Sequence, residues 1–122
     1  MQDWDVLLVD DEEEFVTTLA ERLRLRDIPV RITTDGEEAL RMMETAPPRV
    51  VVLDILMPGL SGLEVLKRIQ ADHPDVKVIL LTGRGSTWDG IQGMRMGVFD
   101  YLMKPLNIND LVEKIYEAVG ES

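Results

Sequence analysis

The chain has 122 residues, of which 13 are basic and 23 acidic, and it carries a formal net charge of −10 and no cysteine. This length suits one domain over residues 1–122, and 45% hydrophobic residues provide for an ordinary core. Cysteine-based disulfides and metal sites are excluded, and direct nucleic-acid binding is not expected because it depends on Lys and Arg. No apolar run approaches the roughly 20 residues that cross a bilayer, so we expect a cytoplasmic protein that does not enter membranes.

Strand-like apolar runs alternate with stretches of helical periodicity along the whole chain. In chain order we expect a strand at Val6–Val9, a helix carrying Phe15, Leu19 and Leu23, a strand at Val30–Thr33, a helix at Gly36–Glu44, a strand at Val50–Leu53, a helix carrying Leu63, Leu66 and Ile69, a strand at Val78–Leu81, a helix at Trp88–Met96, a strand at Phe99–Met103, and a helix from Ile108 to Val119. These five strand–helix units predict an α/β fold, a doubly wound parallel sheet covered by helices on both faces.

The composition of the strands predicts their place in the sheet. Val6–Val9, Val50–Leu53 and Val78–Leu81 are continuously apolar, as expected of central strands that are buried on both faces. Val30–Thr33 alternates between apolar and polar residues, which favours a position near an edge.

Parallel α/β sheets place their sites outside the carboxyl ends of the strands. The residues that follow the expected strands are Asp10 and Asp11, Thr34 and Asp35, Asp54, Thr82 and Gly83, and Lys104 and Pro105. Each of them has an ordinary structural explanation when it is read alone. The two aspartates after the first strand would cap a helix, as would Glu12–Glu14, for which capping is the favoured interpretation. The others would be a strand end, a turn hydroxyl and a solvated lysine.

Together these residues indicate a chemical site at one edge of the sheet. Three converging carboxylates raise one another's pKa unless a cation compensates them, and oxygen ligands without His or Cys favour Mg²⁺. Asp54 ends the most apolar strand, so we expect it to be the nucleophile that forms an aspartyl phosphate. Lys104 would supply a second positive charge, while the Thr82 hydroxyl and the Gly83 N–H would donate to a phosphoryl oxygen.

Four short motifs carry a resemblance to a known family. They are "LLVDDE" with Asp10 and Asp11, "VVLDILMPGLSG" from Val51 to Gly62, "LLTG" from Leu80 to Gly83, and "DYLMKP" from Asp100 to Pro105. In this order and spacing they resemble the receiver domain of two-component response regulators, over essentially the whole chain. The resemblance implies a flavodoxin-like, CheY-like (βα)5 fold with strand order 2-1-3-4-5.

The resemblance also implies roles for single residues. Asp54 would accept a phosphoryl group from the phosphohistidine of a sensor histidine kinase, or from a small phosphodonor. Asp11 and Asp54 would bind Mg²⁺ directly, Asp10 through water, and the backbone carbonyl of Leu56 would be a further ligand. The Lys104–Pro105 peptide would be cis.

A switch is implied in the same way. On phosphorylation, Thr82 would move toward the phosphoryl group and Tyr101 would turn inward behind it. The surface of Trp88–Met96, Phe99–Met103 and the last helix would then change its preference for an output partner, an effector domain or a second copy of the chain. The implied activity is signalling, with no catalysis beyond the domain's own phosphoryl transfer and autodephosphorylation.

Three other classes of protein share parts of the pattern. A phosphohydrolase of the haloacid-dehalogenase type has Asp-x-Asp after its first strand and a longer chain, whereas the pair here is adjacent. A flavodoxin needs a hydroxyl-rich phosphate loop where this chain has "DDEEE". An interaction module without phosphorylation would be expected to have a degenerate acidic site.

The expected helix Trp88–Met96 contains Gly90 and Gly93 and is followed by Gly97. An interior glycine costs a helix about 1 kcal/mol relative to alanine, so we expect this helix and the preceding "TGRGST" loop to be the most mobile part of the domain. The alternative is that the glycines permit close packing.

Overall fold

The computed structural model describes residues 3–57, 59–83 and 87–120, with the side chains of 87–90 left out. Strands and helices alternate along the chain. In order they are β1 (Val6–Val9), α1 (Glu13–Arg24), β2 (Val30–Thr33), α2 (Gly36–Thr45), β3 (Val50–Asp54), α3 (Gly62–Asp72), β4 (Lys77–Thr82), α4 (Thr87–Arg95), β5 (Asp100–Met103) and α5 (Ile108–Val119).

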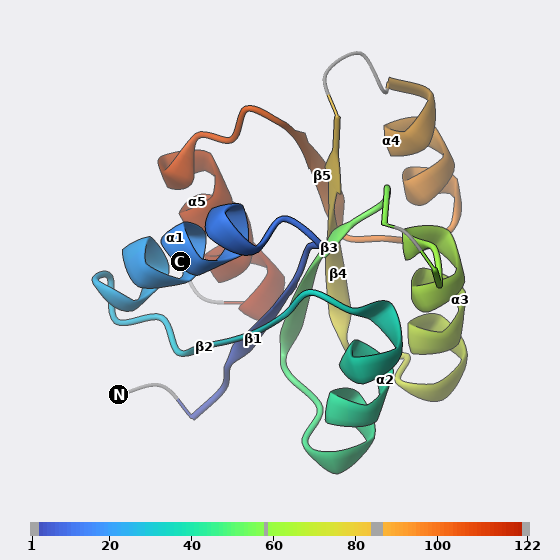
Figure 1. Ribbon diagram of the computed structural model, residues 1–122, viewed down its shortest axis with the longest axis horizontal. Coiled ribbons are helices and arrows are strands. Elements are labelled where there is room, and N and C mark those ends of the chain that lie inside the picture. The colour runs from blue at the N-terminus through green and yellow to red at the C-terminus, as the bar shows by residue number, and fades with distance from the viewer. Residues whose placement is uncertain (1–2, 58, 84–86, 121–122) are drawn as a thin grey trace.

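The strands form one parallel sheet in the order β2-β1-β3-β4-β5. Helices α1 and α5 cover one face of the sheet, and α2, α3 and α4 cover the other (Figure 1). This arrangement confirms the expected doubly wound α/β fold, including the central position of β1, β3 and β4 and the edge position of β2.

Burial on both faces explains why the central strands are continuously apolar. Along β1, Val6 and Leu8 pack in the core beneath α1 and α5, while Leu7 and Val9 pack in the core beneath α2 and α3. Each such side chain contributes roughly 1.5–3 kcal/mol when it leaves water. Strand β2, at the edge, leaves its two middle residues only half-buried, as its alternating sequence indicates.

Two strands run further than the apolar pattern predicts. Asp54 pairs with Leu81 and belongs to β3, and Thr82 pairs with Met103 and belongs to β4. These polar residues are therefore the last members of a hydrogen-bonded ladder, which fixes their backbone more firmly than a loop would.

The helices begin at different kinds of cap. The side chains of Asp35, Ser61 and Asn107 each accept a backbone N–H at the start of α2, α3 and α5. Glu12 occupies the N-cap position of α1, but its side chain makes no capping hydrogen bond. The carboxylate of Glu12 is thus available for another contact.

Gly93 in α4 is explained by packing. A Cβ at this position would collide with the side chain of Leu80 and would lie 3.5 Å from Val98 Cγ2. The close-packing alternative therefore holds for Gly93, because the glycine lets α4 approach β4. Residues 84–86 of the preceding "TGRGST" loop lie outside the described residues.

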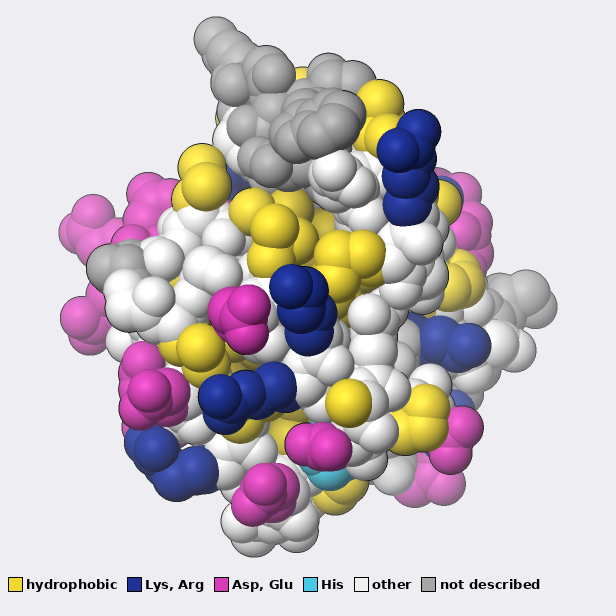
Figure 2. Space-filling view, turned by 90° about the vertical axis from the view of Figure 1, so that its right-hand side faces the viewer, with side chains coloured by type: hydrophobic (Ala, Val, Ile, Leu, Met, Phe, Trp, Pro, Cys, Tyr) yellow, Lys and Arg dark blue, Asp and Glu magenta, His cyan; other side chains and the backbone are white. Residues whose placement is uncertain are grey.

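The face formed by α3 and α4 carries a central group of apolar side chains bordered by Lys and Arg (Figure 2). On α4, Ile91 and Met94 are 41% and 46% exposed. In the part of the chain that the structure describes, no helix has the length and apolarity needed to span a bilayer.

Candidate functional site

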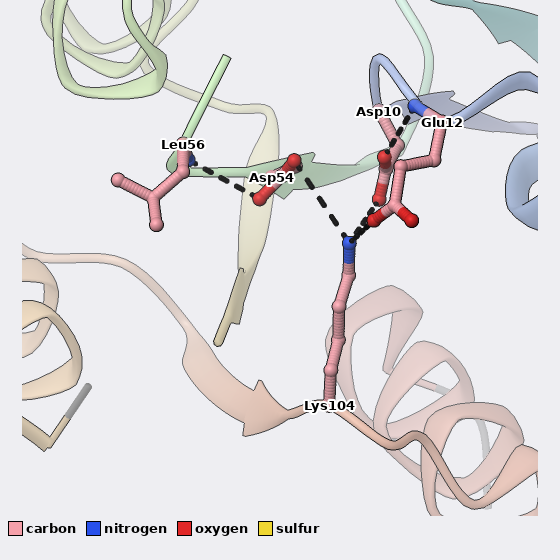
Figure 3. Close-up of polar contacts among 5 residues, drawn as sticks. All are labelled: Asp10, Glu12, Asp54, Leu56 and Lys104. Atoms are coloured by element: carbon pink, nitrogen blue, oxygen red, sulfur yellow. Dashed lines mark hydrogen bonds and ion pairs between the residues drawn. The ribbon is translucent and has the colours of Figure 1, made fainter. Parts of the chain in front are cut away.

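The carboxyl ends of four neighbouring strands bring the site together (Figure 3). Asp10 follows β1, Asp54 ends β3, Thr82 ends β4 and Lys104 follows β5. Backbone hydrogen bonds extend past the strands, from Asp10 N–H to Thr33 O (3.2 Å) and from Lys104 N–H to Thr82 O (2.8 Å). The functional side chains therefore project from backbone that these hydrogen bonds hold in place.

The first residue of α3 packs directly against the backbone of Asp54 and Ile55. A Cβ on Gly62 would lie 2.5 Å from Ile55 Cα and 2.7 Å from Ile55 O, and it would also collide with the carbonyl of Asp54. The Gly62 N–H donates to Ile55 O at 3.1 Å. Only glycine lets the helix seat directly against the backbone that carries the expected nucleophile.

Three carboxylates form a compact acidic cluster. Asp10, Asp11 and Asp54 each offer one oxygen, and these oxygens lie within 4.8 Å of one another. Asp10 and Asp54 are 1% and 5% exposed, whereas Asp11 is exposed. Asp10 Oδ1 accepts the Glu12 N–H at 2.9 Å, and Asp54 Oδ1 accepts the Leu56 N–H at 3.2 Å.

The ammonium of Lys104 is shared unequally among its acidic neighbours. Its Nζ lies 2.8 Å from Asp10 Oδ2, 2.9 Å from Glu12 Oε1 and 3.9 Å from Asp54 Oδ2. It also lies 4.5 Å from the centre of the Phe15 ring, within cation–π range. In this state the lysine is held on the side of β1 and α1 rather than at Asp54.

Burial and mutual repulsion set the protonation of the cluster. Burial, followed by the charge of Asp10, raises the pKa of Asp54 to about 7, although Lys104 and the Leu56 N–H oppose this. Burial likewise raises the pKa of Asp10 against the hydrogen bonds that Asp10 receives. Burial alone would lower the pKa of Lys104, but its contacts with Asp10 and Glu12 and the charge of Asp54 raise it. One ammonium thus compensates the carboxylates incompletely.

Thr82 adds a buried hydroxyl whose hydrogen-bonding capacity is unsatisfied within the described structure. The residue is 1% exposed, and its Oγ1 has no hydrogen-bond partner among the described residues. A buried hydroxyl of this kind is costly unless a ligand satisfies it. Clustered carboxylates without His or Cys fit a hard divalent cation such as Mg²⁺, and a free donor and an ammonium beside them fit an anion.

Comparison with known proteins decides which class of protein has this site. The model of the family described as the response regulator receiver domain matches residues 6–116. The chain belongs to this family. The receiver domain is therefore the signalling domain of a two-component response regulator, and the phosphohydrolase and flavodoxin alternatives are wrong.

The receiver domain is similar to several curated regulators. It is 36% identical over 122 residues to the uncharacterized transcriptional regulatory protein YkoG of Bacillus subtilis (strain 168), covering 100% of this chain and 54% of YkoG. It is 38% identical over 117 residues to the transcriptional regulatory protein CpxR of Escherichia coli (strain K12), covering 96% and 50%. The receiver domain thus spans about half the length of these relatives.

Solved structures agree with this family and fold. The receiver domain of NtrX from Brucella abortus has a TM-score of 0.91 and 31% identity, with 97% of this chain and 100% of that chain covered. A response regulator receiver domain protein from Clostridium thermocellum has a TM-score of 0.90 and 32% identity, with 96% and 94% covered.

The structure brings together most residues that the sequence of the receiver domain singles out. Asp10, Asp11, Asp54 and Lys104 meet as expected. The backbone N–H of Leu56 donates to Asp54, its side chain is 63% exposed, and the role of its carbonyl as a metal ligand stays a prediction.

Tyr101 and the Lys104–Pro105 bond complete the predicted set. Tyr101 is half-buried on β5 and packs against the core beneath α2 and α3. The Lys104–Pro105 peptide bond is cis.

Two residues of this receiver site were missed from the sequence. Glu12 was assigned to helix capping, but its side chain pairs with Lys104. Phe15 was predicted only as one of three apolar residues, with Leu19 and Leu23, in the first helix. It is half-buried, packs against the core and also lies beside the lysine. Their closeness to Asp11 in sequence was the available signal.

Proposed function

We propose that residues 1–122 form the phosphoacceptor domain of a two-component response regulator, in which Asp54 takes a phosphoryl group in a Mg²⁺-dependent reaction. The observation that carries the proposal is the acidic cluster at the ends of β1 and β3, with the Lys104 ammonium beside it. A sensor histidine kinase is the expected phosphodonor for a member of this family.

The proposed transfer balances as a substitution at phosphorus. A carboxylate oxygen of Asp54 forms the new O–P bond while the N–P bond of a phosphohistidine breaks. The electron pair of that bond stays on the imidazole nitrogen, which then takes up a proton. No redox partner or other co-reactant is required.

The residues of the chain position the reaction and stabilise its charge. Asp54 Oδ1 is oriented by the Leu56 N–H, and Oδ2 faces Lys104 at 3.9 Å. Asp11 and Asp54 would bind Mg²⁺ directly, with Asp10 through water and the carbonyl of Leu56 as a further ligand. Bound Mg²⁺ supplies positive charge against the carboxylates and the phosphoryl oxygens.

The buried hydroxyl of Thr82 would complete the phosphoryl site. Its unpartnered Oγ1, together with the Gly83 N–H and the Lys104 ammonium, would donate to phosphoryl oxygens. Thr82 would shift toward the phosphoryl group, and Tyr101, one strand away, would turn inward behind it. This movement would connect Asp54 to the outside of the domain.

The output surface that we propose comprises α4, β5 and α5. It carries exposed apolar side chains at Ile91, Met94 and Met103, which suit a protein partner. That partner would be an effector domain, a separate protein or a second copy of the domain.

The decisive experiment is the intact mass of the protein after treatment with phosphoramidate or acetyl phosphate. We expect one added phosphoryl group with Mg²⁺, none with EDTA and none on Asp54→Asn. The exposed, distant Asp75→Asn variant is the matched control and should be modified like the wild type. Absence of any adduct on the wild type, together with no binding of beryllofluoride in calorimetry, would favour an interaction module instead.

A further inference from the structure

Glu12 has a side chain whose position the helix does not explain. It lies at the N-cap of α1, where Ser, Thr, Asp and Asn are preferred because they accept a backbone N–H. Its carboxylate makes no such bond and instead contacts Lys104 at 2.9 Å. Glu13 and Glu14 already place negative charge in the first turn of α1, so a third acid is not needed for the helix dipole.

The contact holds Lys104 on one side of the site. The ammonium is ion-paired with Asp10 and Glu12 and lies over Phe15, all of which follow β1 (Figure 3 shows the two acids). Asp54 is farther away, at 3.9 Å. A phosphoryl group on Asp54 would have to draw the ammonium away from these neighbours.

The two acids that contact Lys104 differ in whether a cation bound at the site would also contact them. Asp10 is buried and belongs to the acidic cluster that a cation would occupy. The side chain of Glu12 is 63% exposed and lies outside that cluster. Glu12 therefore remains as a competitor for the ammonium when a phosphoryl group arrives.

We propose that Glu12 is a positioning residue that restrains Lys104 on the α1 side and thereby lowers the affinity of the site for a phosphoryl group on Asp54. The inference rests on the proposed function and deepens it, because it names a residue that tunes how readily the domain is loaded. An exposed ion pair is weak and sensitive to salt, so the restraint is a modest and reversible one.

The test measures the affinity for beryllofluoride, a phosphoryl mimic, by calorimetry with saturating Mg²⁺ in about 50 mM salt. Glu12→Gln removes the competing charge and should bind about two- to fivefold more tightly than the wild type, in line with exposed ion pairs. Glu13→Gln, which changes the same charge one residue later, is the matched control and should bind like the wild type. The gain in Glu12→Gln should shrink as salt is raised.

A second background separates action through Lys104 from a general charge effect. In Lys104→Met the ammonium is absent, so the double variant Lys104→Met/Glu12→Gln should bind beryllofluoride with the same affinity as Lys104→Met alone. The inference is overturned if Glu12→Gln binds like Glu13→Gln or more weakly, or if its gain persists in the Lys104→Met background. Each variant is first checked for a wild-type circular dichroism spectrum and cooperative unfolding.

These outcomes stay distinct from failure of the proposed function. A wild type that takes up a phosphoryl group from phosphoramidate while Glu12→Gln and Glu13→Gln behave alike overturns the inference alone. A wild type that takes up no phosphoryl group and binds no beryllofluoride overturns both.

Discussion

Asp54 is an ionisable residue that is deeply buried. Burial disfavours its charged form and so makes its carboxylate more reactive than one in water. The four residues that precede it in β3 are almost completely buried, and its pKa is raised to about 7 by burial and by the charge of Asp10. A carboxylate in this position is less stable as an anion than one in water. Keeping a reactive carboxylate buried at the carboxyl end of β3 therefore lowers the folding stability of the domain.

The stability of the metal-free domain should consequently depend on pH through Asp54. Between the ordinary pKa of 3.8 and the raised pKa of about 7, the folded state holds more protons than the unfolded state. The free energy of unfolding should thus fall as pH rises from about 4 to about 7, by an amount on the order of a few kcal/mol, and level off above. Urea denaturation in EDTA across this range measures it.

Asp54→Asn removes the titrating group and should remove most of this fall. A smaller fall remains because the pKa of Asp10 is raised as well. Asp75→Asn is the matched control on the surface and should keep the wild-type profile. An unchanged slope in Asp54→Asn would contradict the assignment of the fall to Asp54.

Thr82 likewise buries a polar group, here a neutral hydroxyl, at a cost in stability. Its buried hydroxyl lacks a partner among the described residues, so Thr82→Val should raise the free energy of unfolding by about 1 kcal/mol in the metal-free domain. The same change should weaken beryllofluoride binding, since the proposed donor to the phosphoryl group is lost. Chemical denaturation and calorimetry measure the two effects.

Thr33 provides a matched control in the same sheet. It is 4% exposed and so is buried like Thr82, but its Oγ1 donates to Glu38 Oε1 at 2.7 Å. Thr33→Val should therefore lower the free energy of unfolding by about 1 kcal/mol and leave beryllofluoride binding unchanged. If both variants lost the same stability, the hydroxyl of Thr82 would not be an unsatisfied group.

Helix α4 illustrates how packing overrides helix propensity at the scale of an element. Alanine is favoured over glycine by about 1 kcal/mol in a helix interior, yet a Cβ at Gly93 would collide with Leu80. Gly93→Ala should therefore lower the free energy of unfolding by about 1–3 kcal/mol, measured by urea denaturation.

A shorter partner side chain should relieve the collision. Leu80→Val removes the atom that the new Cβ would meet, so the double variant should lose less stability than the sum of the two single changes. A stabilising Gly93→Ala would mean that propensity outweighs packing at this helix.

The elements could be predicted well wherever burial dictated their composition. Continuous apolar runs identified β1, β3 and β4 because both of their faces are covered, and alternation identified β2 as an edge strand. The ends of β3 and β4 were placed one residue short. Asp54 and Thr82 continue the ladder although they are polar, and a pattern of hydrophobicity does not register a hydrogen-bonded polar residue.

The site was predictable in its main members and not in its supporting ones. Asp10, Asp11 and Lys104 follow strands and Asp54 ends one, so the parallel topology alone brings them together. The Glu12–Lys104 pair joins side chains that are 92 residues apart and depends on their rotamers, which local pattern does not specify. The tight seat of Gly62 likewise depends on how closely α3 approaches β3.

The charge of the whole molecule makes a metal response easy to misread. With a net charge of −10, any added cation screens repulsion to some degree. Binding in the acidic cluster should add about 1.4 kcal/mol of stability at a Mg²⁺ concentration ten times the Kd. We expect the melting temperature at pH 8 to rise by about 3–8 °C, measured by calorimetry against NaCl of equal ionic strength.

The response should distinguish site binding from screening. Asp11→Asn should lose most of the shift because it removes a proposed ligand, while Asp75→Asn should keep it. The shift in the wild type should also be smaller at pH 5, where Asp54, with its pKa of about 7, is mostly protonated. An equal shift in all variants at both pH values would point to screening alone.

The parallel sheet assembles its charges from widely separated parts of the chain, and this matters while the protein is being synthesised. Asp10 emerges early, Asp54 near the middle and Lys104 only after all five strands. A nascent chain that has reached β4 holds the acids of the cluster without the ammonium that partly offsets them. The proposed phosphoacceptor therefore becomes competent only near the end of translation of this domain, so that nascent chains that have not yet reached Lys104 would not draw phosphoryl groups from the kinase.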